Sequence, residues 1–219
     1  TLLTERAKRV PPGLDDKQLT SWNALAIRGM AIAGRVLDRE DLIDAAVTAA
    51  TFVRENLFVD GRLLATYKEG RARFAAYLDD YAFLVEALLE LLQSRWDAAQ
   101  LEFAIEIADA LLEHFEDKDA GGFYFTADDH ETLMHRPKPL ADEAVPSGNG
   151  VAALALQRLG HLVGEHRYIE AAERALRSAW KAMDEYPHGH VTLITALEEY
   201  LDPPEIIVIR GDAGEANQW

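Results

Sequence analysis

The chain has 219 residues, 49% of them hydrophobic and 27% charged, which is ample for one sizeable core. Because 38 acidic residues outnumber 22 lysines and arginines, the formal net charge is −16, and the surface should repel nucleic acid and anionic membranes. The absence of cysteine excludes disulfides, thiolate catalysis and cysteine zinc sites, and suits a cytoplasmic protein. No segment is apolar for long enough to predict a membrane helix. We therefore expect a cytoplasmic protein with no nucleic-acid and no membrane partner.

Two kinds of helix alternate along the sequence. Four segments are apolar nearly all round, which predicts helices covered on every side, at residues 20–36, 77–93, 147–161 and 189–201. The three segments between them carry apolar residues on one side only, at residues 41–56, 97–115 and 166–183. The alternation predicts repeated helical hairpins, in which an outer layer of helices wraps an inner one.

The turns from inner to outer helices are short, whereas two of the three returns are long. The return at 57–76 contains Asp60-Gly61 between two apolar runs, which predicts a β-hairpin. The return at 116–146 contains Gly-Gly-Phe-Tyr-Phe-Thr, which predicts a strand at 121–126. Long loops at one end of a rigid helical scaffold are the usual place for binding residues.

The last residues differ in character from the helices. A β-branched run follows two prolines and ends in a turn, which predicts a short C-terminal strand. A lone strand is not a domain, and the chain begins without methionine. We therefore expect residues 1–202 to form a helical barrel portion and residues 203–219 to begin a truncated α/β segment of a larger protein.

Polar side chains gather where three inner helices begin. Asp15 precedes the first of them, Asp79-Asp80 opens the second, and Asp142 and Ser147 precede the third. Each return from an outer helix reaches an inner helix at the same end of the repeat, so these beginnings should share one rim. We expect the following polar residues to surround one mouth: Asp15, Asp16, Asn23, Asp79, Asp80, Tyr81, Arg136, Lys138, Asp142, Glu143, Ser147 and Asn149.

Four ordered motifs resemble one known family, the YyaL-type proteins, relatives of a spermatogenesis-associated protein with an N-terminal thioredoxin-like domain. The motifs are Asp15-Asp16-Lys17 with Leu19-Thr20-Ser21-Trp22-Asn23, then Leu78-Asp79-Asp80-Tyr81-Ala82-Phe83, then Gly121-Gly122-Phe123-Tyr124-Phe125-Thr126, and finally Arg136-x-Lys138 with Asp142-x-Ala144-x-Pro146-Ser147-Gly148-Asn149. The resemblance implies an (α/α) barrel similar to those of six-hairpin glycosidases and N-acylglucosamine 2-epimerases. No CxxC motif is present, so no redox role is carried over.

The fold that we predict is all-α. It is an (α/α) toroid fragment of the six-hairpin glycosidase type, with about seven helices, β-hairpin insertions and the short C-terminal strand. A closed six-hairpin barrel has twelve helices, so seven helices predict an incomplete groove.

Carboxylates at the rim are the candidates for catalysis. Glycoside hydrolysis needs two carboxyl groups, one protonated and one ionised, and Asp79, Asp80 and Asp142 can supply them. The alternative is structural, because aspartate at a helix start is most often an N-cap or a partner of the helix dipole. In that alternative, Asn should replace Asp80 or Asp142 with little change in stability, since Asn is nearly as good an N-cap.

Other polar and aromatic side chains of the rim are candidates for substrate binding: Asp15, Asp16, Trp22, Asn23, Tyr81, Tyr124, Arg136, Lys138, Ser147 and Asn149. Two alternatives stay open for members of this set. Trp22 belongs to a helix that is apolar all round, which favours a place in the core. Arg136 and Lys138 can instead form ion pairs with Asp142 that pin the long loop. His188 and His190 stand at the start of the last inner helix, where a surface or capping role is favoured over epimerase chemistry.

The function that we predict is that of a carbohydrate-active enzyme of the glycoside hydrolase or sugar epimerase type. It would act on a small neutral saccharide through the rim carboxylates, with no metal and no cofactor. The alternative is a non-catalytic sugar- or protein-binding module of a thioredoxin-domain protein. A thioredoxin-like domain that this sequence lacks is a further candidate partner.

Overall fold

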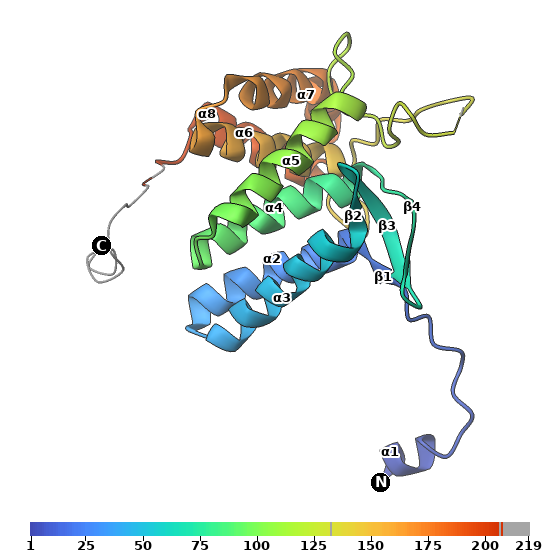
Figure 1. Ribbon diagram of the computed structural model, residues 1–219. Helices are drawn as coiled ribbons and strands as arrows, with labels where there is room; N and C mark the ends of the chain where they lie inside the picture. Colours follow the sequence, from blue (N-terminus) through green and yellow to red (C-terminus); the bar gives the residue numbers. More distant parts are fainter. Residues whose placement is uncertain (132, 206, 208–219) are drawn as a thin grey trace.

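The computed structural model describes residues 1–131, 133–205 and 207 of the chain (Figure 1). Seven long helices form two layers. The inner layer consists of α2 (Thr20–Leu37), α4 (Leu78–Ser94), α6 (Gly148–Val163) and α8 (Val191–Leu201), which pack side by side in this order. The outer layer consists of α3 (Glu40–Leu57), α5 (Ala98–His114) and α7 (His166–Glu185). The predicted alternation of inner and outer helices is confirmed, and a five-residue helix α1 (Leu2–Arg6) precedes it.

The inner helix α4 shows why the sequence predicts buried helices. Every residue of α4 from Asp80 to Leu92 is buried, because α2, α5 and α6 pack around it. The outer helix α7 buries only the stripe that contains Tyr168, Ala172, Leu176 and Met183. As the apolar periodicity indicates, helices with one solvent-exposed face alternate with helices that are buried on every side.

The helix α2 departs from the prediction. Trp22 is 66% exposed, and Val36 and Leu37 near the end of α2 are exposed as well, so the expected core position of Trp22 is wrong. The reason is that α2 is the edge of the inner layer. It packs on α4 to one side and is backed by α3, and no further inner helix of the described part of the chain lies on its other side. Phe83, by contrast, belongs to the centrally placed helix α4 and is fully buried.

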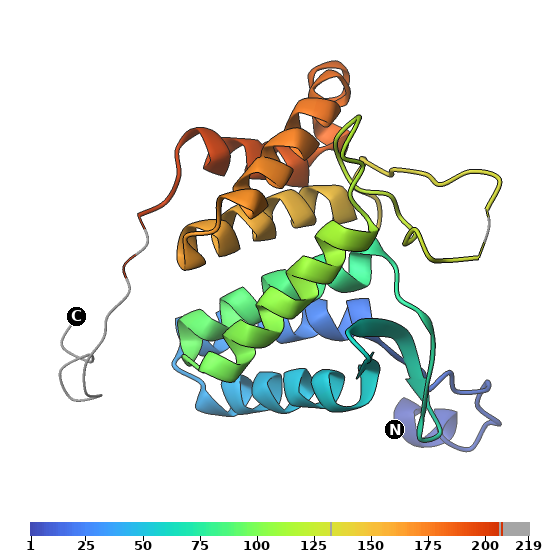
Figure 2. The ribbon, with the colours of Figure 1, turned by 45° about the horizontal axis from the view of Figure 1, so that its top comes forward.

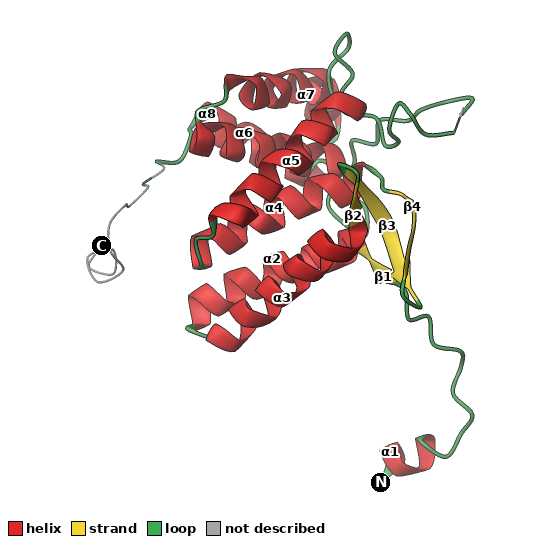
Figure 3. Cartoon of the chain, in the orientation of Figure 1, coloured by secondary structure: helices red, strands yellow, loops and turns green. Residues whose placement is uncertain are grey.

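A small antiparallel sheet covers the beginning of α2 (Figure 3). The strands are β1 (Gln18–Leu19), β2 (Phe58–Val59), β3 (Arg62–Lys68) and β4 (Arg71–Ala75), and all three others pair with β3. The predicted hairpin at Asp60-Gly61 is confirmed as β2 and β3. The second hairpin, between β3 and β4, was not predicted, because β4 is only five residues long and consists mostly of alanine and arginine, which do not favour strands.

The long segment between α5 and α6 is a loop. The predicted strand at 121–126 is wrong, since only a single bridge between Glu116 and Phe123 forms there. Gly121 and Gly122 have φ values of +77° and +78°, which no regular strand adopts. Figure 2 shows this loop at the same end of the helix layers as the sheet. The scaffold therefore gathers its irregular segments at the beginnings of the inner helices.

Two further observations bound the fold. The predicted C-terminal strand falls mostly on residues 206 and 208–219, which lie outside the described residues. No helix of the described part is long and apolar enough to cross a membrane.

Candidate functional site

The four inner helices begin at a common rim, and Asp80 connects the first two of them. Its Oδ1 accepts a hydrogen bond from the N–H of Ser21 in α2 at 2.8 Å. Its Oδ2 accepts another from the N–H of Tyr77, just before α4, also at 2.8 Å. Asp80 is only 3% exposed, and this burial raises its pKa to about 6, although the two N–H groups act in the opposite direction. Both carboxylate oxygens are therefore engaged by the backbone.

Asp142 repeats this arrangement between the last two inner helices. Its Oδ1 accepts from the N–H of Ser147 at the start of α6 at 2.8 Å. Its Oδ2 accepts from the N–H of Thr192 in the first turn of α8 at 2.9 Å. Burial opposes the ionisation of Asp142, but the N–H groups of Thr192 and Ser147 outweigh it and hold its pKa below the ordinary value. Asp142 therefore bridges two helix starts as a carboxylate.

Asp79 differs from both of these carboxylates. It is half-buried in the first turn of α4, and it accepts no hydrogen bond from the described part of the chain. Burial first, and the charge of Asp80 second, raise its pKa to about 6. Asp79 packs against Gly148 of α6, where a Cβ atom would lie 2.2 Å from its Oδ1. Only glycine at position 148 therefore leaves room for this carboxyl group.

Asp79 begins a charged stripe along α4. Glu86 and Glu90 follow it at spacings of seven and eleven residues, which bring side chains back to the same face of a helix. Leu88 lines one pocket together with Phe103 of the outer helix α5, and it lies about 200° around α4 from Glu86. The stripe therefore faces away from the outer layer, on the inner face of the toroid fragment.

Arginines of the neighbouring inner helices balance this stripe. Arg28 of α2 lies 2.9 Å from Glu86, although its Nε–H is not aligned for a hydrogen bond. Glu90 pairs with Arg35 of α2 at 3.2 Å and with Arg158 of α6 at 3.5 Å. Burial raises the pKa of Glu86, with Arg28 and Arg158 acting against it. We did not predict these residues as site members, although their charges interrupt otherwise apolar helices at regular spacing.

The long loop uses two predicted site residues to attach to α6. The side chain of Asn149 is fully buried; its Nδ2 donates to the carbonyl groups of Phe123 and Pro139, each at 2.9 Å. Its Oδ1 accepts from the N–H of Phe123 at 2.7 Å. Ser147 is the N-cap of α6, where its Oγ accepts from the N–H of Gly150. Asn149 and Ser147 therefore position backbone and are not free to contact a ligand.

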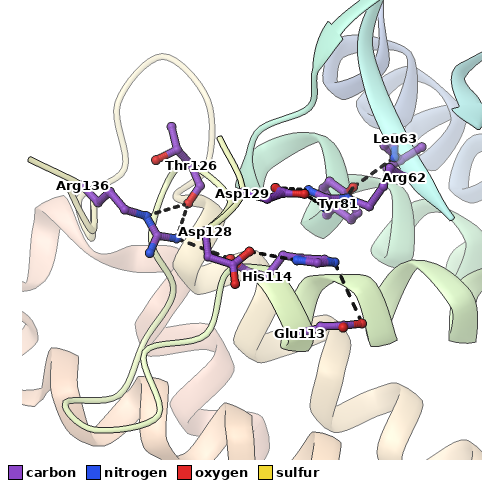
Figure 4. Close-up of polar contacts among 9 residues, drawn as sticks. All are labelled: Arg62, Leu63, Tyr81, Glu113, His114, Thr126, Asp128, Asp129 and Arg136. Carbon is purple, nitrogen blue, oxygen red and sulfur yellow. Dashed lines mark hydrogen bonds and ion pairs between the residues drawn. The ribbon is translucent and has the colours of Figure 1, made fainter. Parts of the chain in front are cut away.

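Arg136 and Lys138 hold the loop to itself. Arg136 donates to the carbonyl of Thr126 at 2.6 Å (Figure 4). It also stacks over the ring of Tyr124, with 4.2 Å from the guanidinium carbon to the ring centre. Lys138 and the hydroxyl of Tyr124 both donate to Asp117, at 2.7 and 2.8 Å. The predicted network with Asp142 does not form, because Asp142 is engaged by backbone N–H groups. The loop-pinning alternative is nevertheless the one that the geometry favours for both cations.

Tyr81 has a structural environment as well. It is fully buried, and its hydroxyl accepts from the N–H of Leu63 at 3.0 Å and from the Nε–H of Arg62 at 3.2 Å (Figure 4). This contact ties β3 to α4. Tyr81 therefore fixes the sheet on the helix layer and presents no free group at the rim.

The residues before α2 do not join the carboxylates. Asp15 pairs with Lys17 and Asp16 pairs with Lys68, each at 2.7 Å, and both aspartates are exposed. Lys68 is the last residue of β3, so these aspartates flank the sheet and not the mouth. The segment that joins α1 to β1 runs away from the helix layers (Figure 1). The expected places of Asp15 and Asp16 in the ring of rim residues are therefore wrong. Asn23 donates to the carbonyl of Leu19 at 2.8 Å and so closes the first turn of α2.

The histidines near α8 are arranged as the structural alternative expects. His188 is exposed, and His190 is buried with its Nδ1 2.8 Å from the carbonyl of Tyr186. The His190 ring therefore packs into the turn between α7 and α8, as a structural histidine does.

One group of side chains has the composition of a metal site. The ligand atoms of His114, Asp128 and Asp129 lie within 4.8 Å of one another. Asp129, however, pairs with Arg62, and Nδ1 of His114 lies 2.9 Å from Asp128 (Figure 4). Both aspartates are largely exposed. These contacts explain the cluster as ion pairs that attach the long loop to α5 and β3.

Comparison with known proteins confirms the resemblance seen in the motifs. No protein-family model matches the chain. A human protein named spermatogenesis-associated protein 20 is 32% identical over 222 residues, which cover 96% of this chain and 28% of the human protein. An uncharacterized protein of Caenorhabditis elegans is 27% identical, over 96% of this chain and 30% of its own length. The chain is thus a homologue of one part of these proteins. It spans less than a third of the length of these relatives.

Solved structures confirm the toroid fold. The chain is similar to a GH76 alpha-mannanase of Bacteroides thetaiotaomicron, with a TM-score of 0.66 and 13% identity over 90% of this chain and 55% of that one. It is also similar to the cellobiose 2-epimerase of Spirochaeta thermophila, with a TM-score of 0.60 and 20% identity over 74% and 43% of the two chains. At such identities the likeness establishes the fold alone. The chain therefore shares its fold with a sugar epimerase and a glycoside hydrolase.

Proposed function

We propose that the chain contributes the acid–base part of a carbohydrate-active site of the glycoside hydrolase or sugar epimerase type. The observation that carries the proposal is the state of Asp79. Its carboxyl group is half-buried, accepts no hydrogen bond from the described residues and has a pKa raised to about 6. A carboxyl group near this pKa can donate and accept a proton at neutral pH.

The roles of the three predicted catalytic aspartates then divide. Asp79 transfers the proton, to a glycosidic oxygen in hydrolysis or from a carbon beside a carbonyl group in epimerisation. Asp80 raises the pKa of Asp79 through its charge and holds the start of α2. Asp142 holds the starts of α6 and α8 and remains ionised. Asp80 and Asp142 are positioning residues in this proposal, because both oxygens of each accept backbone hydrogen bonds.

The charge of the inner face supports a small neutral saccharide as the substrate. Asp79 begins a stripe in which Glu86 and Glu90 are matched by arginines from the helices on either side. A face with balanced charges favours neither an anion nor a cation, and its carboxylates and guanidinium groups can hydrogen-bond to hydroxyl groups. Trp22, which is exposed at the start of α2, offers an aromatic surface for a sugar ring.

The test is turnover on a panel of neutral disaccharides, with product analysis, for this chain and for a longer protein that contains it. Asp79→Asn should lower turnover by about 10²–10⁴-fold, the usual contribution of a general acid or base, with little change in saccharide affinity. Gly148→Ala should also lower turnover, because the new methyl group displaces the Asp79 carboxyl group. Asp119→Asn, at an exposed loop position, is the matched control. Turnover that survives Asp79→Asn refutes the assignment.

The second candidate is a non-catalytic sugar- or protein-binding module of a thioredoxin-domain protein. It is favoured by the observation that Tyr81, Arg136, Lys138 and Asn149 direct their polar groups to the protein itself. In this case the saccharides bind without turnover in every variant, or a thioredoxin-like domain of the longer protein binds at the rim in their place.

A further inference from the structure

The hairpin of β3 and β4 is basic in an acidic protein. Residues 62–75 contain four basic side chains and one acidic side chain, whereas acidic residues dominate the chain as a whole. Arg62 pairs with Asp129, and Lys68 pairs with Asp16. Arg71 and Arg73 are exposed and form no ion pair with the described part of the chain. Positive charge therefore remains uncompensated at β4, on a protein with ample carboxylates elsewhere.

The strand register gathers this charge on one face of the sheet. Lys68 lies directly opposite Arg71, and Arg73 lies opposite Thr66, so these side chains share a face. Tyr67 is on the other face, where it packs edge-on against Phe52 of α3 at 5.0 Å. The basic face thus turns away from the helices. Since Asp16 neutralises Lys68, Arg71 and Arg73 are the cations of this face that no carboxylate of the described residues pairs with.

The strand β4 is also a free edge. It pairs with β3 on one side, and no strand of the described residues pairs with its other side (Figure 3). Phe74 in this strand is 66% exposed and has a φ of +64°, a strained left-handed conformation for a bulky residue. An exposed aromatic residue beside arginines has the composition of a binding hot spot. Positive charge on an edge repels most strands that could add to it, but it attracts an acidic one.

We propose that β4 docks an acidic, extended segment of a partner protein, which adds to the sheet as a further strand. Backbone hydrogen bonds along the free edge supply the pairing. Arg71 and Arg73 select carboxylate side chains at alternate positions of the segment, where the strand period brings them to the basic face. Phe74 packs on an apolar residue of the segment, which lies between two of its carboxylate residues. This surface belongs to the sheet and not to Asp79, so the inference stands independently of the proposed function.

The probe is a fluorescent synthetic nonapeptide in which glutamate and valine alternate, and the readout is fluorescence anisotropy with this chain. We expect saturable binding that weakens as salt rises. The double charge reversal Arg71→Glu with Arg73→Glu should weaken binding by about tenfold or more, because attraction becomes repulsion. Lys118→Glu, which reverses another exposed charge in the long loop, should leave binding unchanged. Circular dichroism checks that the variants fold, which is expected since both arginines are exposed.

A second peptide distinguishes strand addition from simple charge attraction. Methylation of alternate backbone nitrogens removes the N–H donors that face β4 and keeps every carboxylate. If methylation of the acidic peptide abolishes its binding, the result supports an added strand. Equal binding of both peptides, binding that survives the double charge reversal, or stronger binding of a single-stranded RNA of matched charge would each overturn the proposal. Absence of saturable binding would overturn it as well.

Discussion

Replacing Asp142 by Asn tests the bridging arrangement that organises the rim. A carboxylate offers two acceptor oxygens, and Asp142 uses both of them, toward Ser147 and Thr192. Asn offers one acceptor oxygen and one NH₂ group, which is only a donor. In the variant, one backbone N–H therefore faces another donor and loses its hydrogen bond. The view that Asn substitutes freely for a capping Asp holds for one contact but not for two at once.

The size of the effect follows from the lost contact. A hydrogen bond to a charged group contributes about 1.5–3 kcal/mol, and an N-cap is typically worth about 1 kcal/mol. Asp142 is only partly buried, so water replaces some of what is lost. We expect Asp142→Asn to lower the free energy of unfolding by about 1–2 kcal/mol. For a domain of this size the melting temperature should fall by about 3–6 °C.

The assay is urea unfolding at pH 7, with Asp97→Asn as the matched control. Asp97 is the N-cap of α5 and accepts from a single backbone N–H, that of Ala99 at 2.8 Å. Asn can keep this one contact, so the control should change the free energy of unfolding by only a few tenths of a kcal/mol. If Asp142→Asn is no more destabilising than Asp97→Asn, the two-helix bridge contributes nothing to stability and the reasoning fails.

Three further predictions follow from the same geometry. Asp79 and Asp80 have pKa values of about 6 in the folded chain, against about 3.9 when unfolded. The folded chain therefore binds their protons more tightly, and the stability that this protonation provides is complete below pH 4 and is lost as the pH rises through 6. Urea unfolding from pH 4 to 7 should show this loss, and Asp79→Asn should make it smaller; an unchanged profile contradicts the pKa shift. Asn149→Ala leaves the buried N–H and C=O of Phe123 without partners, and should cost about 2–4 kcal/mol and expose the long loop to limited proteolysis. EDTA should leave saccharide turnover unchanged, and a loss restored by added metal would refute the metal-free assignment.

The helices could be predicted because their signal is local. Apolar periodicity separates α4, which is covered on every side, from α7, which has one wet face, and short turns order the layers. The short strand β4 could not be predicted, because pairing with β3 and not its own pattern holds it in the sheet. The strand expected at 121–126 fails for the opposite reason. Its aromatic residues have strand propensity, but the two glycines before them adopt positive φ values.

The position of the candidate site could be predicted from the sequence, but the role of each aspartate in it could not. The repeat brings Asp80 and Asp142 to comparable helix starts, as the common direction of the inner helices implies. Which of the rim aspartates is engaged depends on N–H groups of another helix, at Ser21 and Thr192, and no spacing along the sequence reveals those contacts. The arginine partner of Glu86 could not be predicted for the same reason, since Arg28 comes from the neighbouring helix α2.

The adjacent pair Asp79-Asp80 shows how one helix start can supply both structure and chemistry. Neighbouring residues in the first turn of a helix point about 100° apart, so the two carboxyl groups enter different surroundings. Asp80 meets the start of α2 and is held by two N–H groups, whereas Asp79 lies against the bare backbone of Gly148 and accepts no hydrogen bond from the described residues. A side chain larger than hydrogen at position 148 would fill the space that the Asp79 carboxyl group occupies. Capping explains Asp80 completely, and it leaves Asp79 unexplained. The carboxyl group that the protein does not use for its own backbone is therefore the one to test for catalysis.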